Sequence, residues 1–332
     1  MKDFISPESI SLVFALFMGI SLFIYAVLDG YDLGVGVLSF FLDEEEKDPA
    51  IDSIGPFWDA NETWLVLSVG ILLVAFPKAH GEILGNVYLP VSFMLLGLIL
   101  RGVAYDFRKK VHASGKSFWT ALFAWGSLVA AISQGFMLGL YLSSFRKDLS
   151  SQLFASFTAI ALLLVYVSMG SNWLLMKSPQ QHFEKILDLA KRSLFLCAFS
   201  ILVVAVSKPF FITRALNPLD SVESILVLAP YPMMTALLIT IIFLIYYTKT
   251  FRHSGLVWLP FVLMVTVMAL LSHGIVMSLF PYVIPGQLTL RESVASVESL
   301  LIILAGAGIV LPIQMIYTIF IYRIFHGRVK IQ

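Results

Sequence analysis

Nine stretches of this sequence contain no Asp, Glu, Lys or Arg, and they constrain the possible folds more than any other feature. They cover residues 9–28, 63–77, 83–100, 117–145, 149–176, 193–207, 224–248, 253–290 and 299–322. A helix of roughly 20 apolar residues crosses the ~30 Å hydrocarbon core of a bilayer, so most of these stretches are long enough to span a membrane. We therefore predict an all-α polytopic membrane protein with about nine transmembrane helices.

The composition excludes the other broad classes. Of the 332 residues, 59% are apolar and 13% are charged, whereas soluble domains carry about 25% charged residues. This balance excludes a soluble globular protein and a disordered one. The net charge of +1 gives no reason to expect nucleic acid as a partner. The single cysteine, Cys197, excludes a disulfide within the chain and a cysteine-based metal site.

We expect one integral membrane domain over residues 1–332, because no long loop or low-complexity tract interrupts the pattern. Flanking interfacial residues extend two short stretches, and Pro281 and Pro285 end the helix that precedes them. The first span is too long for the apolar region of a signal peptide, so we expect it to be retained. The predicted spans are about 9–28, 57–77, 83–101, 118–143, 151–176, 192–208, 223–248, 257–280 and 299–323.

The basic residues between the spans predict the orientation of the chain. Segments that follow odd-numbered spans hold 15 of the 22 Lys and Arg residues, and the other segments hold 7. Lys and Arg are concentrated in cytoplasmic loops. This rule places the N-terminus outside and the C-terminus in the cytoplasm.

Ionisable residues near three span ends are the strongest functional candidates, because a charge at membrane depth costs about 2.5–3.5 kcal/mol on insertion scales. Asp29 and Asp32 close the first span and share a helix face if the helix continues. Asp59 and Glu62 open the second span with the same spacing, and Arg101 closes the third. The predicted topology brings all of them to the cytoplasmic face.

Two interpretations of these residues remain open. Interfacial anchoring by snorkelling side chains is favoured for Arg108, Lys109, Lys110, Asp32 and Asp106. Asp29 and Asp59 are equally compatible with a proton-conducting or buried polar network, because aspartate is too short to snorkel far. Neutralisation of one of the acids by Arg101 would favour a structural ion pair instead.

The histidines give little support for a haem site within this chain. Only His273 lies at membrane depth, and it has no histidine partner within a span. We therefore favour a packing role for His273 over axial ligation of a haem. His80 is expected in a short external turn that begins at Phe76.

Three motifs together resemble subunit II of the cytochrome bd quinol oxidases. They are Asp29-Gly30-Tyr31-Asp32-Leu33-Gly34-Val35-Gly36, Trp58-Asp59-Ala60-Asn61-Glu62-Thr63-Trp64-Leu65 and Arg101-Gly102-Val103-Ala104-Tyr105-Asp106-Phe107-Arg108. Further similar segments are Gly170–Ser178, Phe280–Pro285 and Phe325–Arg328, so the resemblance extends over essentially the whole chain. The short length resembles the branch that includes the cyanide-insensitive oxidases.

The resemblance implies a subunit of a bacterial cytoplasmic-membrane oxidase that reduces dioxygen to water with electrons from quinol. It implies that haems b and d and the quinol-oxidising site belong to a partner, subunit I, and that this chain ligates no metal. Asp29 and Asp59 match the acids of the family's proton route, with Trp58, Asn61, Glu62 and Arg101 as a supporting polar network. A small single-helix subunit and membrane lipid are further expected partners.

Two departures and one alternative accompany this resemblance. Ala60 replaces a glycine found in many members, and no family role transfers to His80 or His273.

A proton-coupled secondary transporter also uses embedded carboxylates and glycine-broken helices. Against a transporter, the charged groups gather at one face of the membrane rather than at its midplane. An adjacent gene for a larger protein rich in membrane histidines and methionines would favour the oxidase.

Overall fold

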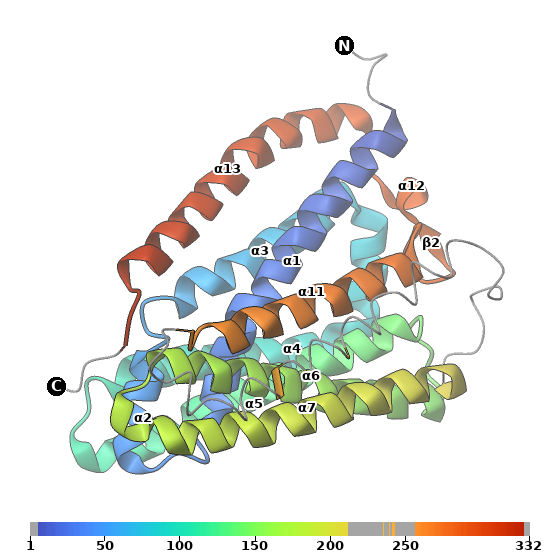
Figure 1. The fold of residues 1–332 in the computed structure, drawn as a ribbon. Helices are drawn as coiled ribbons and strands as arrows, with labels where there is room; N and C mark the ends of the chain where they lie inside the picture. Colours follow the sequence, from blue (N-terminus) through green and yellow to red (C-terminus); the bar gives the residue numbers. More distant parts are fainter. Residues whose placement is uncertain (1–5, 212–234, 236–238, 240, 243–255, 329–332) are drawn as a thin grey trace. The chain divides into compact units, whose positions relative to one another are not determined.

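A computed structural model describes residues 6–211, 235, 239, 241–242 and 256–328 (Figure 1). The long helices are α1 (Pro7–Leu38), α3 (Trp58–Ala75), α4 (Pro77–Arg108), α5 (Ala113–Leu142), α6 (Leu149–Lys177), α7 (Phe183–Phe211), α11 (Leu259–Leu279) and α13 (Val297–Ile324). The short elements are α2 (Glu44–Asp52), the 3-10 turn η2 (Gln180–His182), strands β1 (Tyr282–Ile284) and β2 (Leu288–Thr289), and α12 (Leu290–Ser293).

Eight of these helices are long and apolar enough to cross a membrane. This confirms the prediction of an all-α polytopic membrane protein. The predicted span 223–248 lies outside the described residues, apart from the helical positions Thr235, Ile239, Ile241 and Ile242. The helix α11 ends at Leu279, as the prolines at 281 and 285 predict.

Two helix boundaries differ from the limits of the predicted spans and turns. The helix α1 continues to Leu38, ten residues beyond the predicted end of the first span, so Asp29 and Asp32 lie inside a helix. The predicted external turn around His80 is absent, because α4 begins directly at Pro77 and its only described irregularity is a kink at Val87. Proline suits the first turn of a helix, since no intrahelical hydrogen bond is lost there.

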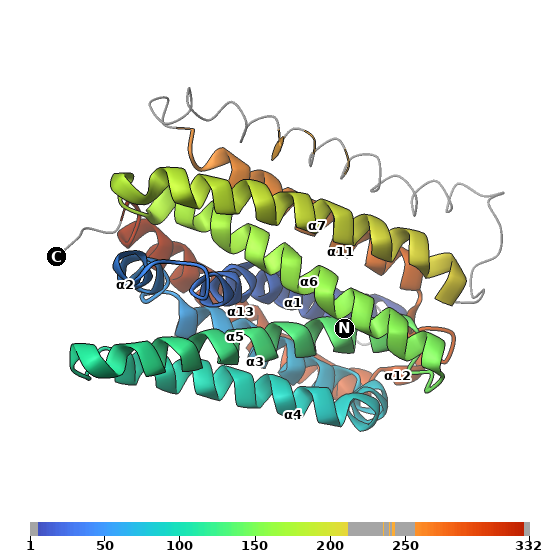
Figure 2. The same cartoon turned by 90° about the horizontal axis from the view of Figure 1, so that it is seen from below.

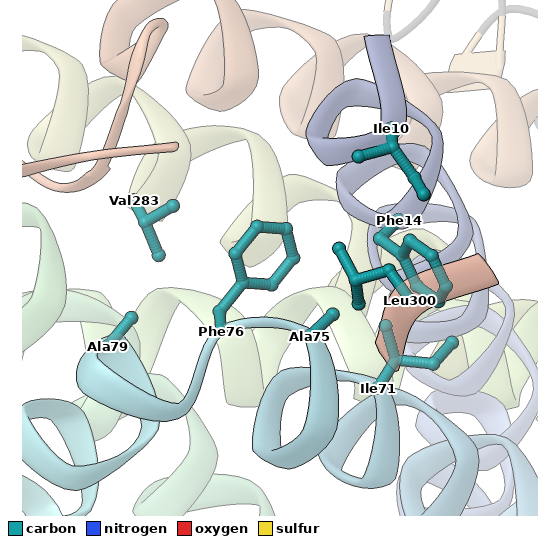
Figure 3. Close-up of a cluster of buried hydrophobic side chains, with 8 residues drawn as sticks. All are labelled: Ile10, Phe14, Ile71, Ala75, Phe76, Ala79, Val283 and Leu300. Atoms are coloured by element: carbon teal, nitrogen blue, oxygen red, sulfur yellow. The ribbon is translucent and has the colours of Figure 1, made fainter. Parts of the chain in front are cut away.

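The described chain divides into two compact units, which we consider separately. The first unit comprises Met1–Asp29, Pro56–Asn86 and Leu279–His326. An apolar cluster joins the N-terminal part of α1 to the end of α3, the start of α4, β1 and α13 (Figure 3); its members are Ile10, Phe14, Ile71, Ala75, Phe76, Ala79, Val283 and Leu300. The Ala295 backbone N–H donates to the Ala75 carbonyl at 2.9 Å, which fixes the segment before α13 against the end of α3.

The second unit comprises Gly30–Gly55, Val87–Ser278 and Gly327–Gln332. Helices α5, α6 and α7 pack in sequence order within it (Figure 2). The closest approach in this unit joins α1 and α6. A Cβ atom added to Gly34 would lie 1.9 Å from the Tyr166 carbonyl oxygen, and one added to Gly170 would lie 2.6 Å from the Gly34 carbonyl carbon.

Substitution Gly34→Ala is expected to lower the free energy of unfolding by about 1–3 kcal/mol, the usual cost of overpacking, because the added methyl group overlaps backbone rather than a movable side chain. Gly19→Ala, in the same helix, is the matched control, since nothing lies within 4 Å of a Cβ at that position. Thermal unfolding of both variants in detergent tests this. Equal stability of the two would contradict the packing described here.

Candidate functional site

The start of α3 carries four of the predicted site residues at different degrees of burial. Asn61 is completely buried, Trp58 and Glu62 are partly buried, and Asp59 is exposed. The helix begins at Trp58, so Asp59 lies in its first turn, where a negative charge is favoured by the helix dipole. The first turn therefore presents one exposed carboxyl group beside a buried amide.

The Asn61 side chain connects three helices of the first unit. Its Nδ2–H donates to the Leu28 carbonyl oxygen of α1 at 3.4 Å, directly before Asp29. Its Oδ1 accepts a hydrogen bond from the Tyr322 hydroxyl of α13 at 3.3 Å. The Tyr322 ring also stacks on Phe57, with ring centroids 4.5 Å apart. Asn61 thus ties the start of α3 to the part of α1 that carries Asp29.

One face of α13 supplies polar partners that the sequence analysis missed. Gln314 donates to the Thr63 hydroxyl, and the Trp64 Nε1–H donates to the Thr318 hydroxyl at 3.3 Å. Gln314, Thr318 and Tyr322 are spaced four residues apart, and this spacing places them on one helix face. That periodicity within an apolar span was the available signal.

The acids of α1 are buried more deeply than interfacial anchoring allows. Asp29 and Asp32 have no exposed surface in this chain. The anchoring interpretation is therefore wrong for Asp32, although it fits the exposed Asp106. Asp29 belongs to the first unit with Asp59 and Asn61, and Asp32 belongs to the second. Buried ionisable groups within membrane helices are costly, which makes them functional candidates.

Arg101 is buried at a close crossing of α4 and α5 in the second unit. Its exposed fraction is 1%. A Cβ atom added to Gly126 of α5 would lie 2.6 Å from the Gly97 carbonyl oxygen and 2.8 Å from the Arg101 backbone nitrogen. Because Gly97 and Gly126 lack side chains, the backbones of α4 and α5 approach closely beside Arg101.

Arg108 is not a snorkelling residue, contrary to prediction. Its side chain is buried, donates from Nε to the Thr120 hydroxyl at 2.8 Å, and forms an ion pair with Asp48 of α2. Lys116 forms a second ion pair with Asp48 at 3.0 Å. Partial burial raises the pKa of Asp48, but the hydrogen bonds from Lys116 and Arg108 outweigh it and hold that pKa below its usual value.

The acidic run Asp43-Glu44-Glu45-Glu46 forms the N-cap and first turn of α2. Glu46 is buried, and its carboxylate accepts a hydrogen bond from the Asp43 backbone N–H at 2.8 Å in a capping box. The Lys185 ammonium of α7 lies 2.6 Å from Asp43 and 2.7 Å from Glu46. Its hydrogen bond and charge lower the pKa of Asp43. Glu46 is therefore a structural residue of this run, whereas Glu44 and Glu45 are exposed.

His273 and His80 lie at positions that this chain does not enclose. The His273 side chain is exposed on α11, and His80 is partly exposed near the start of α4. An axial haem ligand needs an enclosed site around the ring. The surroundings of these two histidines in this chain therefore do not fit a haem.

The fold and the buried acids define a multi-pass helical membrane protein with a polar site built from carboxyl and amide groups. The chain matches the sequence model of the family described as "Cytochrome bd terminal oxidase subunit II" over residues 10–325. The chain therefore belongs to the cytochrome bd terminal oxidase subunit II family. Together with its apolar helices, this membership makes it a multi-pass protein of the bacterial cytoplasmic membrane.

Curated relatives agree with this assignment. The chain is 40% identical to the cytochrome bd ubiquinol oxidase subunit 2 of Bacillus subtilis over 41% of this chain and 38% of the relative. It is 31% identical to the cytochrome bd-I ubiquinol oxidase subunit 2 of Escherichia coli over 41% of this chain and 35% of the relative. The matched region thus spans little more than a third of each relative.

The solved bd oxidase of Geobacillus thermodenitrificans contains a chain with a similar fold. The TM-score is 0.73 at 18% sequence identity, and the match covers 94% of this chain and 98% of that chain. This similarity concerns the fold.

Substitution Asn61→Leu is expected to lower the free energy of unfolding by about 1–3 kcal/mol, because it leaves the Leu28 carbonyl and the Tyr322 hydroxyl without this partner in a buried site. Asn86→Leu is the matched control, since the described hydrogen bonds of the Asn86 side chain join it to Glu82 of its own helix and not to another helix. Thermal unfolding in detergent compares the two. An unchanged stability of Asn61→Leu would contradict the bridging role.

Substitution Asp48→Asn is expected to destabilise the protein at pH 7 by an amount that disappears on acidification. A carboxyl group whose pKa is lowered in the folded state stabilises that state fully above its unfolded pKa, about 3.9, and loses the effect as pH falls through the folded pKa. The stability difference from the unsubstituted protein should therefore shrink below about pH 4. Asp188→Asn on α7, whose side chain is 64% exposed, should show a much smaller difference at pH 7. A stability difference between Asp48→Asn and the unsubstituted protein that persists or increases in acid would contradict the ion-pair account.

Proposed function

We propose that this chain acts as the non-haem subunit II of a cytochrome bd-type terminal quinol oxidase, which reduces dioxygen to water in a respiratory chain. The observation that carries the proposal is the family match over residues 10–325. The names of the Bacillus and Escherichia relatives support it. Catalysis belongs to the complex, and this chain supports the haem-bearing partner and delivers protons to the oxygen-reducing site.

Asp59 and Asp29 form the proposed proton pathway. Asp59 is exposed in the first turn of α3, so its carboxyl group can exchange protons with water or with a group on a partner. Asp29 is buried in α1, where a dry environment limits exchange to groups within hydrogen-bond reach. The bond from Asn61 to the Leu28 carbonyl supports the proposal, because it ties the helix of Asp59 to the residue before Asp29.

Trp58, Asn61, Glu62 and Arg101 are the proposed supporting network. Asn61 fixes the geometry through its two hydrogen bonds. Glu62 is partly buried one turn beyond Trp58 and adds a second carboxyl group to the start of α3. Arg101 supplies a buried positive charge, which favours the ionised form of any carboxyl group close to it.

The remaining parts of the proposal concern the assembly. The haems b and d and the quinol-oxidising site are assigned to subunit I, and this chain is assigned no metal. The 332 residues are proposed to form one integral membrane domain, with the N-terminus outside and the C-terminus in the cytoplasm. A small single-helix subunit and membrane lipid are the other proposed partners.

Substitution Asp59→Asn is expected to slow oxygen consumption by the quinol oxidase by roughly 10²-fold or more, within the range contributed by a positioned proton-transfer group. Assembly and haem content should be retained, because Asp59 is exposed in this chain. Oxygen uptake with a quinol substrate, normalised to haem content, measures the effect. Asp29→Asn is the second variant, with a larger risk of disturbing assembly because Asp29 is buried.

Asp106→Asn is the matched control, since Asp106 is an exposed aspartate near the end of α4 and lies outside the proposed pathway. Turnover at the unsubstituted rate in an assembled, haem-loaded Asp59→Asn complex would overturn the proton route. It would leave the assignment to the oxidase intact.

A further inference from the structure

One face of α6 contacts α1 next to its two acidic residues. The contacted positions are Gly30 and Tyr31, between Asp29 and Asp32, and Gly34, which follows Asp32. The ring of Tyr166 covers Gly30, where an added Cβ atom would lie 2.6 Å from Tyr166 Cε1. The Tyr166 hydroxyl donates to the Gln134 side chain of α5 at 2.9 Å, which holds this ring in place. One turn further, Gly170 meets Gly34 through backbone contact.

The third contact is a stack of two aromatic rings. Tyr31 and Trp173 have ring centroids 4.2 Å apart and an interplanar angle of 20°. Phe261 of α11 packs on both, at 5.7 Å from Tyr31 and 5.5 Å from Trp173. Both stacked residues are buried. Offset stacking is directional, so it restricts the rotation of each ring as well as burying it.

Two polar contacts fix the indole ring of Trp173. Its Nε1–H donates to the Ser53 hydroxyl, which follows α2, at 3.2 Å. The Lys177 ammonium lies 5.0 Å from the centre of the ring, within range of a cation–π interaction. The ring on which Tyr31 stacks is thus held from α6 itself, from α11 and from the segment after α2.

These contacts fix the rotation of α1 about its own axis in the segment that carries Asp29 and Asp32. Asp29 directly precedes Gly30, and Asp32 directly follows Tyr31, within one continuous helix. A carboxyl group lies about 6 Å from the helix axis, so a rotation of about 30° would move it by about 3 Å. A hydrogen bond tolerates a few tenths of an ångström. Proton transfer through Asp29 therefore requires the rotation of α1 to be fixed.

We propose that Trp173 is a positioning residue for proton delivery, acting through the stacked Tyr31 ring on Asp29 of α1. The inference rests on the proposed function, because it assigns Trp173 to the proton route of the oxidase. It also gives a role to the segment Gly170–Lys177, to which the proposed proton pathway assigns none. A packing role alone would be served by any apolar side chain of similar volume.

The test compares three variants within the complete oxidase complex. Trp173→Leu removes the stack and the indole donor, and Trp173→Phe keeps an aromatic ring for Tyr31 while losing the donor to Ser53. Trp125→Leu is the matched control, because Trp125 is 56% exposed on α5 of the same unit. Oxygen uptake per haem is recorded with a quinol substrate from pH 5.5 to pH 9, together with the quinol KM.

We expect Trp173→Leu to assemble with the full haem content and to lose about tenfold or more in kcat, since small misplacements of reacting groups have effects of this size. Its quinol KM should stay unchanged and its pH profile should shift. Trp173→Phe should recover most of the rate and the original profile, and Trp125→Leu should match the unsubstituted complex.

Two results would overturn the inference. The first is an unchanged rate per haem and an unchanged pH profile for Trp173→Leu. The second is a loss of rate that follows loss of haem equally in the Leu and Phe variants, which would show a structural role only. Failure of the proposed function looks different, since the unsubstituted complex would then consume no oxygen with quinol, or Asp59→Asn would have no effect.

Discussion

At Gly34 and Gly170, helices α1 and α6 approach so closely that a single methyl group on either would overlap backbone of the other. This contact places the end of α1 in the interior of the second unit, where neighbouring helices rather than lipid surround it. A helix buried in protein tolerates ionisable residues that lipid would not. The continuation of α1 through Asp29 and Asp32 to Leu38 depends on that environment.

The site that results combines rigid helices with one exposed and one buried acid. Asp59 is accessible at the start of α3, whereas Asp29 is enclosed and lies directly after the carbonyl that Asn61 holds. In the proposed pathway, the accessible Asp59 takes up the proton and the enclosed Asp29 passes it on. The polar face of α13 holds the start of α3 through Thr318 and Tyr322.

Much of the fold could be predicted from hydropathy alone, because bilayer thickness sets the length of each span. The extension of α1 could not, since counting charges treats Asp29 as the end of a span and ignores tertiary burial. The anchoring interpretation of Arg108 was wrong for a related reason: its partner Asp48 lies 60 positions earlier, in α2, and nothing in the local sequence indicates the pairing.

The candidate acids Asp29 and Asp59 were identified by their position near the ends of predicted spans and by the family resemblance. Only some of the residues around them were identified in the same way. Asn61 was identified from its motif, but its partner Tyr322 lies 261 positions away on the last helix. The spacing of Gln314, Thr318 and Tyr322 was the available clue. The stack of Tyr31 on Trp173 has no comparable local signal, because two aromatic residues in separate apolar spans do not indicate each other.

The most direct test of the central claim is the reduced-minus-oxidised visible spectrum of the complex purified through a tag on this chain. The account predicts bands of b and d haems, carried by a larger subunit that co-purifies. A haem-free preparation of this chain alone, under conditions in which an established bd oxidase retains its haems, would contradict the assignment to the oxidase.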